Sequence, residues 1–301
     1  MTDGPPFQNA VPDVTVVVVT WNALPWIEQS LESVRGEDVI VVDNGSSDGT
    51  VAFVRERFPT VRVIEQDNRG MGGGNNSGMR VAAGRYFFLL NSDAWVVGDG
   101  LDKLVAFADA HPDAAVVGPR LLNQDGTLQR SVRAEPTLWR VATEYLFIRR
   151  LAPRTNLLNP LYVGGFDHRS VRESDWLSGA ALLVRREAAD EVGLFDEDFF
   201  LFGEEVDWMT RFRRADWKVY FDPEAEVVHV GGASHGGRLY VENLRGHLRW
   251  FDKHDGPEAA ERARRLLLAS LRLRALTLRR SHEREGARFL SSGDARTLLR
   301  K

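Results

Sequence analysis

A run of six residues at 14–19, Val-Thr-Val-Val-Val-Val, constrains the fold of this chain more than any other feature. The run is β-branched throughout, too short for a typical helix and apolar on both faces, as in a strand buried within a parallel sheet. Similar segments follow at 39–42, 61–64 and 86–90, with helical segments between them. This alternation predicts right-handed βαβ crossovers, and therefore an α/β fold with an open parallel sheet.

The segments between these strands carry helix signals. Asn22 is a candidate N-cap for the first helix, and Pro25 lies near its first turn. Further helices are expected over 50–57 and 75–83, the second after a glycine-rich loop. The second half of the chain is less regular: a turn is expected near 123–126, strands near 176–184 and 227–230, helices near 205–215, 238–253 and 258–280, and loops at the glycine pairs 164–165, 231–232 and 236–237.

The composition excludes several classes of protein. Hydrophobic residues make up 43% of the chain and charged residues 27%, which argues against disorder, collagen and coiled coil. There is no cysteine, so disulfides, thiolate zinc sites and cysteine nucleophiles are excluded, and any metal needs oxygen or imidazole ligands. The first residues lack a signal-peptide pattern and no run of 18 apolar residues occurs, so we expect a cytoplasmic protein.

Charge is unevenly distributed along the chain. Residues 240–301 contain 15 Lys and Arg against 8 Asp and Glu, whereas residues 1–239 contain 24 against 35. The acidic body argues against nucleic acid as a partner, and the basic segment favours a negatively charged surface.

The expected helix at 258–280 has one apolar and one basic face. Either its apolar face packs on the body, or the helix lies on an anionic membrane surface. The apolar face holds Leu267, Leu271, Ala275 and Leu278, and the basic face holds Arg265, Arg272 and Arg279.

Polar residues follow each of the four expected strands. Ligands of open α/β sheets bind beyond the carboxyl ends of the strands, so the sequence predicts a ligand site along one rim of the sheet. The residues are Thr20 and Asn22 after the first strand, Asp43 after the second, the stretch 68–76 after the third, and Asn91, Ser92 and Asp93 after the fourth.

Two acids at strand ends are candidate ligand-binding groups. A carboxylate that closes a buried apolar strand, as Asp43 does, is poorly placed for stability alone, and in nucleotide-binding α/β folds such an acid binds ribose or base. Asp93 could hold Mg²⁺ or Mn²⁺ together with diphosphate oxygens, or it could form a turn. Asp48 is a favoured helix N-cap. The glycine-rich stretch 68–78 lacks the Lys-Ser/Thr of a P-loop and is either a flexible loop or a nucleotide contact.

Three acids stand where an aromatic run at 199–203 becomes a helix. Acids in a first helical turn favour the helix dipole, which explains one or two of them. The neighbouring aromatic residues suggest a carboxylate that faces a partly dry pocket. The three acids are Glu204, Glu205 and Asp207; further along the chain, His229 is either a core histidine or a ligand.

Seven motifs occur together in one order: VVVVTWN, VVDNGSSDGT, NRGMGGGNNSGM, LLNSDAW, WLSGAALLVRR, FFLFGEEVDWMTRFR and HVGGAS. As a set they resemble the family 2 inverting glycosyltransferases of GT-A fold, and within them the rhamnosyltransferases that use dTDP-L-rhamnose. The resemblance covers about residues 12–255. It implies a GT-A-type, open, mostly parallel sheet flanked by helices, with a helical C-terminal extension.

The resemblance also implies roles for single residues. Glu205 matches the catalytic base, and Asp93 with His229 matches the ligands of a divalent metal, Mg²⁺ or Mn²⁺. Asn91 replaces the first acid of the family's D-x-D motif. The nucleotide-sugar pocket is expected to include Thr20, Asn22, Asp43, Arg69, Asn76, Asn91 and Ser92, and the acceptor site Trp176, Glu204 and Asp207.

These roles predict an enzyme that moves L-rhamnose from dTDP-L-rhamnose onto a hydroxyl of a polyprenyl-diphosphate-linked saccharide, such as GlcNAc, in cell-wall or polysaccharide assembly. Such an acceptor would suit a peripheral position on the inner face of the cell membrane, held through residues 258–280. A metal-dependent nucleotidyltransferase and a catalytically inactive nucleotide-sugar-binding protein are the alternatives. We expect a disordered N-terminus at 1–11, a nucleotide-sugar-binding half at 12–120, an acceptor half at 121–235 and a basic helical extension at 236–301.

Overall fold

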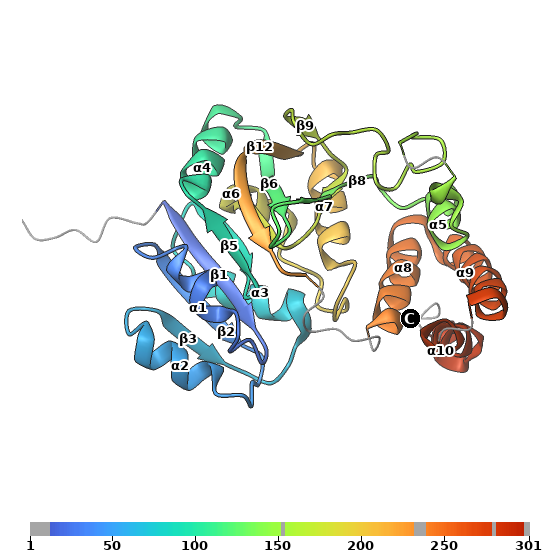
Figure 1. The fold of residues 1–301 in the computed structure, drawn as a ribbon, viewed down its shortest axis with the longest axis horizontal. Helices are drawn as coiled ribbons and strands as arrows, with labels where there is room; N and C mark the ends of the chain where they lie inside the picture. The colour runs from blue at the N-terminus through green and yellow to red at the C-terminus, as the bar shows by residue number, and fades with distance from the viewer. Residues whose placement is uncertain (1–12, 152–153, 232–238, 279–280, 298–301) are drawn as a thin grey trace, which may run out of the picture.

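The computed structural model describes residues 13–151, 154–231, 239–278 and 281–297 (Figure 1). Their centre is a ten-stranded mixed sheet in which eight strands follow the order β3-β2-β1-β4-β11-β6-β12-β5, while β7 pairs with β6 and β9 with β12. Two further short strands, β8 and β10, pair with each other. The strands are β1 (Val14–Thr20), β2 (Asp38–Asp43), β3 (Arg62–Glu65), β4 (Tyr86–Asn91), β5 (Ala94–Val97), β6 (Ala114–Leu122), β7 (Leu128–Gln129), β8 (Val132–Arg133), β9 (Arg172–Glu173), β10 (Trp176–Leu177), β11 (Ala181–Arg185) and β12 (Lys218–His229).

The four strands expected in the first half are confirmed as β1 to β4, and they are parallel. Every residue of β1 is buried, because helices cover both faces of the sheet at this strand. Beyond β4 the sheet becomes mixed, since β11 runs antiparallel to both β4 and β6. The sheet is therefore parallel throughout its first half and mixed in its second, where β12 again runs parallel to β6.

Helices α1, α2 and α4 cover one face of the sheet, and α3, α6 and α7 cover the other. Alternate residues of β1 supply the two cores: Val16 and Val18 pack with the first group, Val17 and Val19 with the second. These helices are α1 (Ile27–Glu32), α2 (Thr50–Arg57), α3 (Gly70–Val81), α4 (Gly100–Ala110), α6 (Arg186–Val192) and α7 (Glu204–Arg214).

The glycine-rich stretch is helical, which corrects the loop expected there. Helix α3 begins at Gly70, five residues earlier than the sequence indicated. The glycines let this helix lie directly on β1: a Cβ atom added to Gly78 would stand 2.4 Å from Cγ1 of Val17. Tertiary contact thus overrides the low helix propensity of glycine.

Three other expectations need correction. Asn22 does not cap α1, because that helix begins only after Trp26. The backbone of Asn22 is left-handed, with a φ of 52°, and the side chain of Asn22 binds the loop at Ser47. The single strand expected at 176–184 is two strands, β10 and β11. The boundary expected after residue 120 falls inside β6, so the two halves share one sheet.

A separate helical layer packs around a third core, on the right in Figure 1. Its members include Val141 of α5, Leu248 of α8, and Leu267 and Leu271 of α9. The apolar face expected on α9 is therefore used for packing, although the side chain of Leu278 lies outside the described residues. Within the described residues every helix is either too short or too polar to span a bilayer. The layer comprises α5 (Leu138–Tyr145), the 3-10 turn η1 (Ile148–Arg150), α8 (Tyr240–Asp255), α9 (Pro257–Leu278), α10 (Ser281–Ser291) and α11 (Gly293–Thr297).

Candidate active site

The carboxyl ends of β1 and β2 form one part of the candidate site. Thr20 and Asp43 are paired in the register of these parallel strands, and both are buried. One carboxylate oxygen of Asp43 accepts hydrogen bonds from the backbone N–H groups of Gly45 and Ser46, at 3.1 and 2.8 Å. The other oxygen, and the hydroxyl of Thr20, have no hydrogen-bond partner in the described residues. Buried polar atoms are normally paired, so this rim holds unused hydrogen-bonding capacity.

Two loops at this rim are tied to each other. The side-chain oxygen of Asn22 accepts a hydrogen bond from the N–H of Ser47, at 2.8 Å. Asp48 accepts one from the N–H of Thr50, the first residue of α2, and another from the N–H of Leu24. Asp48 is therefore not the N-cap that the sequence indicated, because Gly49 takes that position. Its carboxylate still accepts the N–H of the first residue of α2 from one position earlier.

Asp93 and His229 face each other at the ends of β4 and β12. The distance from Nε2 of His229 to Oδ1 of Asp93 is 3.4 Å, and Nδ2 of Asn91 lies 3.4 Å from the same nitrogen. Nδ1 of His229 is 2.7 Å from Oε1 of Gln129, whose amide nitrogen is bound to other oxygen atoms. Gln129 therefore accepts the Nδ1 proton, which leaves the Nε2 lone pair directed at Asn91 and Asp93.

This arrangement suits part of a metal site. The lone pair on Nε2 belongs to the neutral imidazole. When Nε2 is protonated instead, its hydrogen bond and positive charge outweigh the effect of burial and lower the pKa of Asp93. Among the described residues no three His, Asp or Glu side chains converge as a complete metal site. A cation held by Asp93 and His229 would thus take its remaining ligands from substrate oxygens and water, as Mg²⁺ commonly does. Ser92 lies between Asn91 and Asp93 on the same turn.

Glu205 lies at the same rim, at the start of α7. Gly179 packs against its side chain, with a distance of 3.8 Å from the position of a Cβ on Gly179 to Cβ of Glu205. The next residue, Ala180, accepts a hydrogen bond from the N–H of Asn91 at 2.9 Å. Because Asn91 also reaches His229, this short path connects Glu205 with the Asp93–His229 pair.

The two neighbouring glutamates differ in environment. Burial raises the pKa of Glu205, while backbone N–H groups and the charge of Arg133 partly oppose that rise. Burial raises the pKa of Glu204 well above its usual value, and the charge of Glu205 raises it further. One oxygen of Glu204 has no partner within the described segments, and its side chain lies against Gly72 of α3 rather than against Gly179. The structure therefore separates the two carboxyls and turns Glu205 towards the β10–β11 link.

Trp176 is half-buried in β10, directly opposite Arg133 of β8. Its indole N–H donates to the carbonyl of Ala134 at 2.9 Å, which fixes the ring beside the β10–β11 link. No sequence pattern marks Arg133, whose guanidinium lies 5.9 Å from the centre of this ring.

Asn76 and Arg69 hold the segment that precedes α7. The amide of Asn76 is buried and binds both the N–H and the carbonyl of Phe195, while Arg69 and Arg80 form ion pairs with Glu197. The hydrogen bonds of Asn76 are used within the protein, so its expected contact with nucleotide is corrected to a positioning role. Arg69, which is half-exposed, stays a predicted nucleotide contact.

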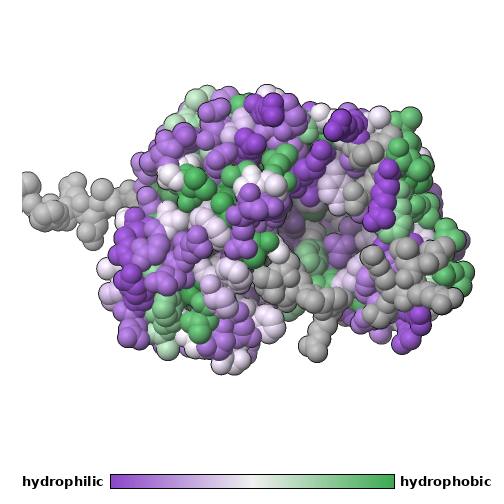
Figure 2. Space-filling model, in the orientation of Figure 1, coloured by the Kyte–Doolittle hydropathy of each residue, from purple (hydrophilic) through white to green (hydrophobic). Residues whose placement is uncertain are grey.

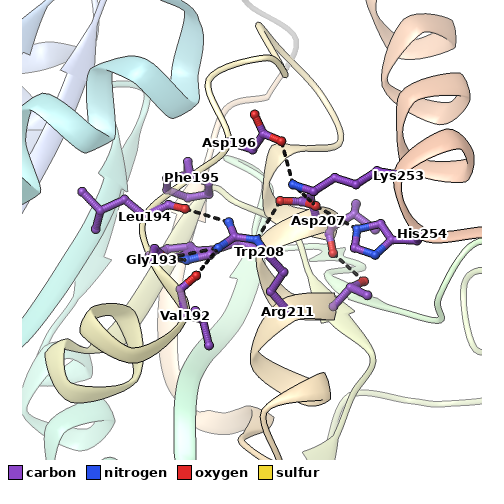
Figure 3. A network of polar contacts seen from close by, with 12 residues as sticks. Val192, Gly193, Leu194, Phe195, Asp196, Asp207, Trp208, Arg211, Lys253 and His254 are labelled. Atoms are coloured by element: carbon purple, nitrogen blue, oxygen red, sulfur yellow. Dashed lines mark hydrogen bonds and ion pairs between the residues drawn. The ribbon is translucent and has the colours of Figure 1, made fainter. Parts of the chain in front are cut away.

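Asp207 is the centre of a buried ionic network, shown in Figure 3. Its fully buried carboxylate is 3.0 Å from Nε of Arg211, 2.8 Å from Nζ of Lys253 and 2.8 Å from Nε2 of His254. Burial would raise the pKa of Asp207, but these hydrogen bonds and charges lower it to about 2. Because these partners come from α7 and α8, Asp207 joins helices instead of meeting an acceptor, which corrects the expected role.

Comparison with known proteins identifies the family of this chain. Residues 15–171 match the model of glycosyl transferase family 2. Over 304 residues the chain is 32% identical to N-acetylglucosaminyl-diphospho-decaprenol L-rhamnosyltransferase of Mycobacterium tuberculosis, an alignment that covers 91% of this chain and 95% of the relative. The chain belongs to glycosyl transferase family 2. It is a glycosyltransferase, as its motifs predicted.

Solved structures agree on the fold of this glycosyltransferase. A mannosyltransferase from Pyrobaculum calidifontis, solved with GDP-Man and Mn²⁺, has a TM-score of 0.55 at 17% identity and covers 97% of this chain and 86% of its own. GalNAc-T7, solved with UDP, GalNAc and Mn²⁺, has a TM-score of 0.56 at 15% identity and covers 82% of this chain and 50% of its own. The expected GT-A fold is thus confirmed.

Sequence reasoning missed three partners of the site in this transferase: Gln129, Lys253 and His254. Each contacts a residue about 50 to 100 positions away, and no local pattern marks it. A single glutamine in a short strand, or a Lys-His pair within a helix, is too common in globular proteins to predict such a contact.

Replacing Asp207 by Asn should destabilise the transferase by about 3–5 kcal/mol, because Lys253, Arg211 and His254 would lose the charge that they surround. Urea unfolding at pH 7 measures this loss. Asp198→Asn, at a mostly exposed carboxylate, serves as the control and should change stability by less than about 0.5 kcal/mol. Comparable stabilities for the two variants would contradict the role given to Asp207.

The same network determines a pH dependence. The folded pKa of Asp207 lies below the unfolded value, so its contribution to stability is complete above the unfolded pKa and is lost as the pH falls towards about 2. The stability difference between the wild type and Asp207→Asn should therefore shrink in urea unfolding at acid pH.

Proposed function

We propose that this glycosyltransferase moves L-rhamnose from dTDP-L-rhamnose to a hydroxyl of polyprenyl-diphosphate-linked GlcNAc, with inversion at the anomeric carbon. The observation that carries the proposal is the contact of Glu205 with Gly179, on the link between β10 and β11. Trp176 stands at the start of this link, and Ala180 near its end is bonded to Asn91, the neighbour of His229. The name of the mycobacterial relative, N-acetylglucosaminyl-diphospho-decaprenol L-rhamnosyltransferase, supports L-rhamnose as the transferred sugar and a GlcNAc-diphospho-polyprenol as the acceptor.

In this reaction Glu205 accepts the proton of the acceptor hydroxyl while that oxygen forms a bond to the anomeric carbon. The bond from the anomeric carbon to the donor diphosphate breaks on the opposite face, and dTDP leaves. The raised pKa of Glu205 suits a general base, because a base is most effective when its pKa lies near the working pH. The N–H of Gly203, at the end of the aromatic run, donates to Oε2 of Glu205 at 3.2 Å and orients the carboxylate.

Asp93 and His229 are the residues that would hold a divalent cation in this enzyme. Such a cation would neutralise the charge that develops on the leaving diphosphate. Gln129 keeps the imidazole in the tautomer that can act as a ligand.

Thr20, Asn22 and Asp43 would bind the nucleoside, since Thr20 and Asp43 carry buried oxygens without a partner among the described residues. Asn91, Ser92 and Arg69 border the same rim and are proposed as diphosphate contacts. Glu204 remains a proposed part of the acceptor site together with Trp176. Family membership favours this function over a nucleotidyltransferase, and measured turnover would separate it from an inactive binding protein.

Calorimetry with dTDP should show binding that depends on Mg²⁺ or Mn²⁺. Asp93→Ala should weaken the metal-dependent binding by about tenfold or more and leave metal-free binding nearly unchanged, because the carboxylate acts only through the cation. Asp113→Ala, at the opposite end of the sheet, is the matched control. Binding of UDP or GDP without binding of dTDP would overturn the donor assignment.

Glu205→Gln should lower kcat by about 10²–10⁴-fold, because the amide cannot accept the hydroxyl proton, while donor affinity stays within about twofold. Rhamnosyl transfer to a short-chain GlcNAc diphosphate at saturating donor measures the loss, and Glu187→Gln, at an exposed position of α6, is the control. In the wild type kcat/KM should fall on the acid side as Glu205 is protonated, with an apparent pKa above 4.5. A Glu205→Gln enzyme of normal kcat would place the base elsewhere.

A peripheral membrane position also belongs to this proposal. Exposed apolar side chains gather on α9 and after α5, along the edge that is partly green in Figure 2. Leu276 is 78% exposed, Leu151 79% and Leu157 72%. No acid occurs from 145 to 166 or from 262 to 282, whereas arginines occur in both stretches. Apolar side chains among basic ones are typical of a surface that lies on anionic lipid.

Leu273→Ser with Leu276→Ser should lower binding to anionic vesicles by roughly tenfold, because both side chains are exposed and would enter the lipid interface. Co-sedimentation measures binding, and the melting temperature should hardly change. Val81→Ser, also exposed but on α3, is the control. Binding should fall as salt rises, since charges are screened over about 10 Å at 0.1 M. If the wild type bound neutral and anionic vesicles equally, or bound neither, the proposed membrane surface would be wrong.

A further inference from the structure

A cavity lies beside Trp176, on the side of the β8–β10 pair. It has a volume of about 340 Å³, and three arginines from separate elements line it. Arg133 belongs to β8, Arg140 to α5 and Arg172 to β9, and Asn156 and Ser174 add polar groups. Convergence of three guanidinium groups on one cavity has a high electrostatic cost unless negative charge offsets it.

Two of these guanidinium groups rest on aromatic rings. Arg133 lies over Tyr162 at 4.2 Å from the ring centre, and Arg172 lies over Phe166 at 4.8 Å. A guanidinium held in this way presents a planar fork of N–H groups, the geometry that binds phosphate by two parallel hydrogen bonds. Arg140 is fixed differently, because its Nη1 donates to the carbonyl of Glu135 at 2.7 Å.

The acids of the cavity offset this charge only in part. Asp175 accepts the N–H of Glu135 at 2.7 Å and lies 3.6 to 3.7 Å from Arg213 and Arg140, so it serves mainly as an anchor for the backbone. Glu173 is mostly exposed and lies 4.0 Å from Lys218. Within the described residues Arg172 forms no ion pair.

We propose that this cavity binds the diphosphate of the acceptor, with the sugar ring between Trp176 and Glu205. The inference rests on the proposed function, which it deepens by assigning the acceptor's anionic group. Arg133 is the link, since it lines the cavity and also lies 5.9 Å from the ring of Trp176. A saccharide stacked on Trp176 with one hydroxyl at Glu205 directs its reducing end, and therefore its diphosphate, towards Arg133.

The far wall of the cavity points to the lipid part of the same acceptor. Asn156, which lines the cavity, precedes Leu157, one of the exposed leucines of the proposed membrane surface. A chain leaving the diphosphate on this side reaches apolar side chains at once. The protein groups thus follow the order of the acceptor's parts. The base meets the hydroxyl, the aromatic ring meets the sugar, the arginines meet the diphosphate, and the leucines meet the polyprenyl chain.

Kinetics with two acceptors test the cavity. Arg172→Ala and Arg140→Ala should each raise KM for a short-chain isoprenyl diphosphate-linked GlcNAc by about tenfold or more, because a hydrogen bond between two charged groups is lost. KM for methyl GlcNAc, which has no diphosphate, and kcat for both acceptors should stay within about twofold. Arg172→Lys should restore part of the loss, and Arg55→Ala, at an exposed ion pair on α2, is the matched control. Equal effects on both acceptors, or no effect on either, would overturn the assignment.

A binding experiment separates this inference from the proposed function. Calorimetry with geranyl diphosphate, in the presence of saturating dTDP to block the donor pocket, should show binding to the wild type and to Asp93→Ala. The Arg140→Ala/Arg172→Ala double variant should lose it. If the wild type binds geranyl diphosphate but transfers no rhamnose, the assignment of the cavity stands and the proposed transfer reaction is wrong. If the wild type transfers rhamnose but does not bind geranyl diphosphate, the assignment of the cavity is wrong.

Discussion

The candidate active site depends on a carboxylate that lies away from the proposed substrates. Asp207 is buried in the first turn of α7 and is bonded to Arg211, Lys253 and His254. Arg211 in turn holds the carbonyls of residues 192–194, and Lys253 also binds Asp196, so one ion joins α7, α8 and the segment before the aromatic run (Figure 3). A buried charge is stable only when its partners are in place, and this requirement fixes the start of α7 relative to the sheet.

That constraint positions Glu205. The segment held by Asp207 is also held by Asn76 of α3, and α3 lies close on β1 because of its glycines. The proposed base is therefore mounted on a helix whose first turn is held by several elements, which is the arrangement a proton transfer needs. Glu204, one residue earlier, faces α3 and is buried more deeply. Two adjacent carboxyls thus differ in environment because the helix directs them to different surroundings.

The donor and acceptor parts of the proposed site rest on different kinds of structure. The donor part consists of strand ends and tight turns, with Asp43, Asn91 and Asp93 on the rigid sheet. The acceptor part is built from the short strands β8 and β10, on which Arg133 and Trp176 face each other, and from the helical layer. No residue is assigned to both parts, so a substitution in the acceptor part is expected to leave the nucleotide pocket unchanged.

The four parallel strands, the rim at which Asp43 and Asp93 stand, and the position of Glu205 at a helix start could all be predicted from the sequence. These features follow from local patterns of apolar and polar residues, which need no knowledge of distant contacts. Only the tertiary structure shows that the glycine-rich stretch is a helix and that Asn76 and Asp207 hold the site together. It also shows that Gln129 orients His229 and that three arginines meet beside Trp176. Each of these depends on contacts between residues far apart in the chain, and such contacts exist only once the helices and strands have packed, so no local pattern encodes them.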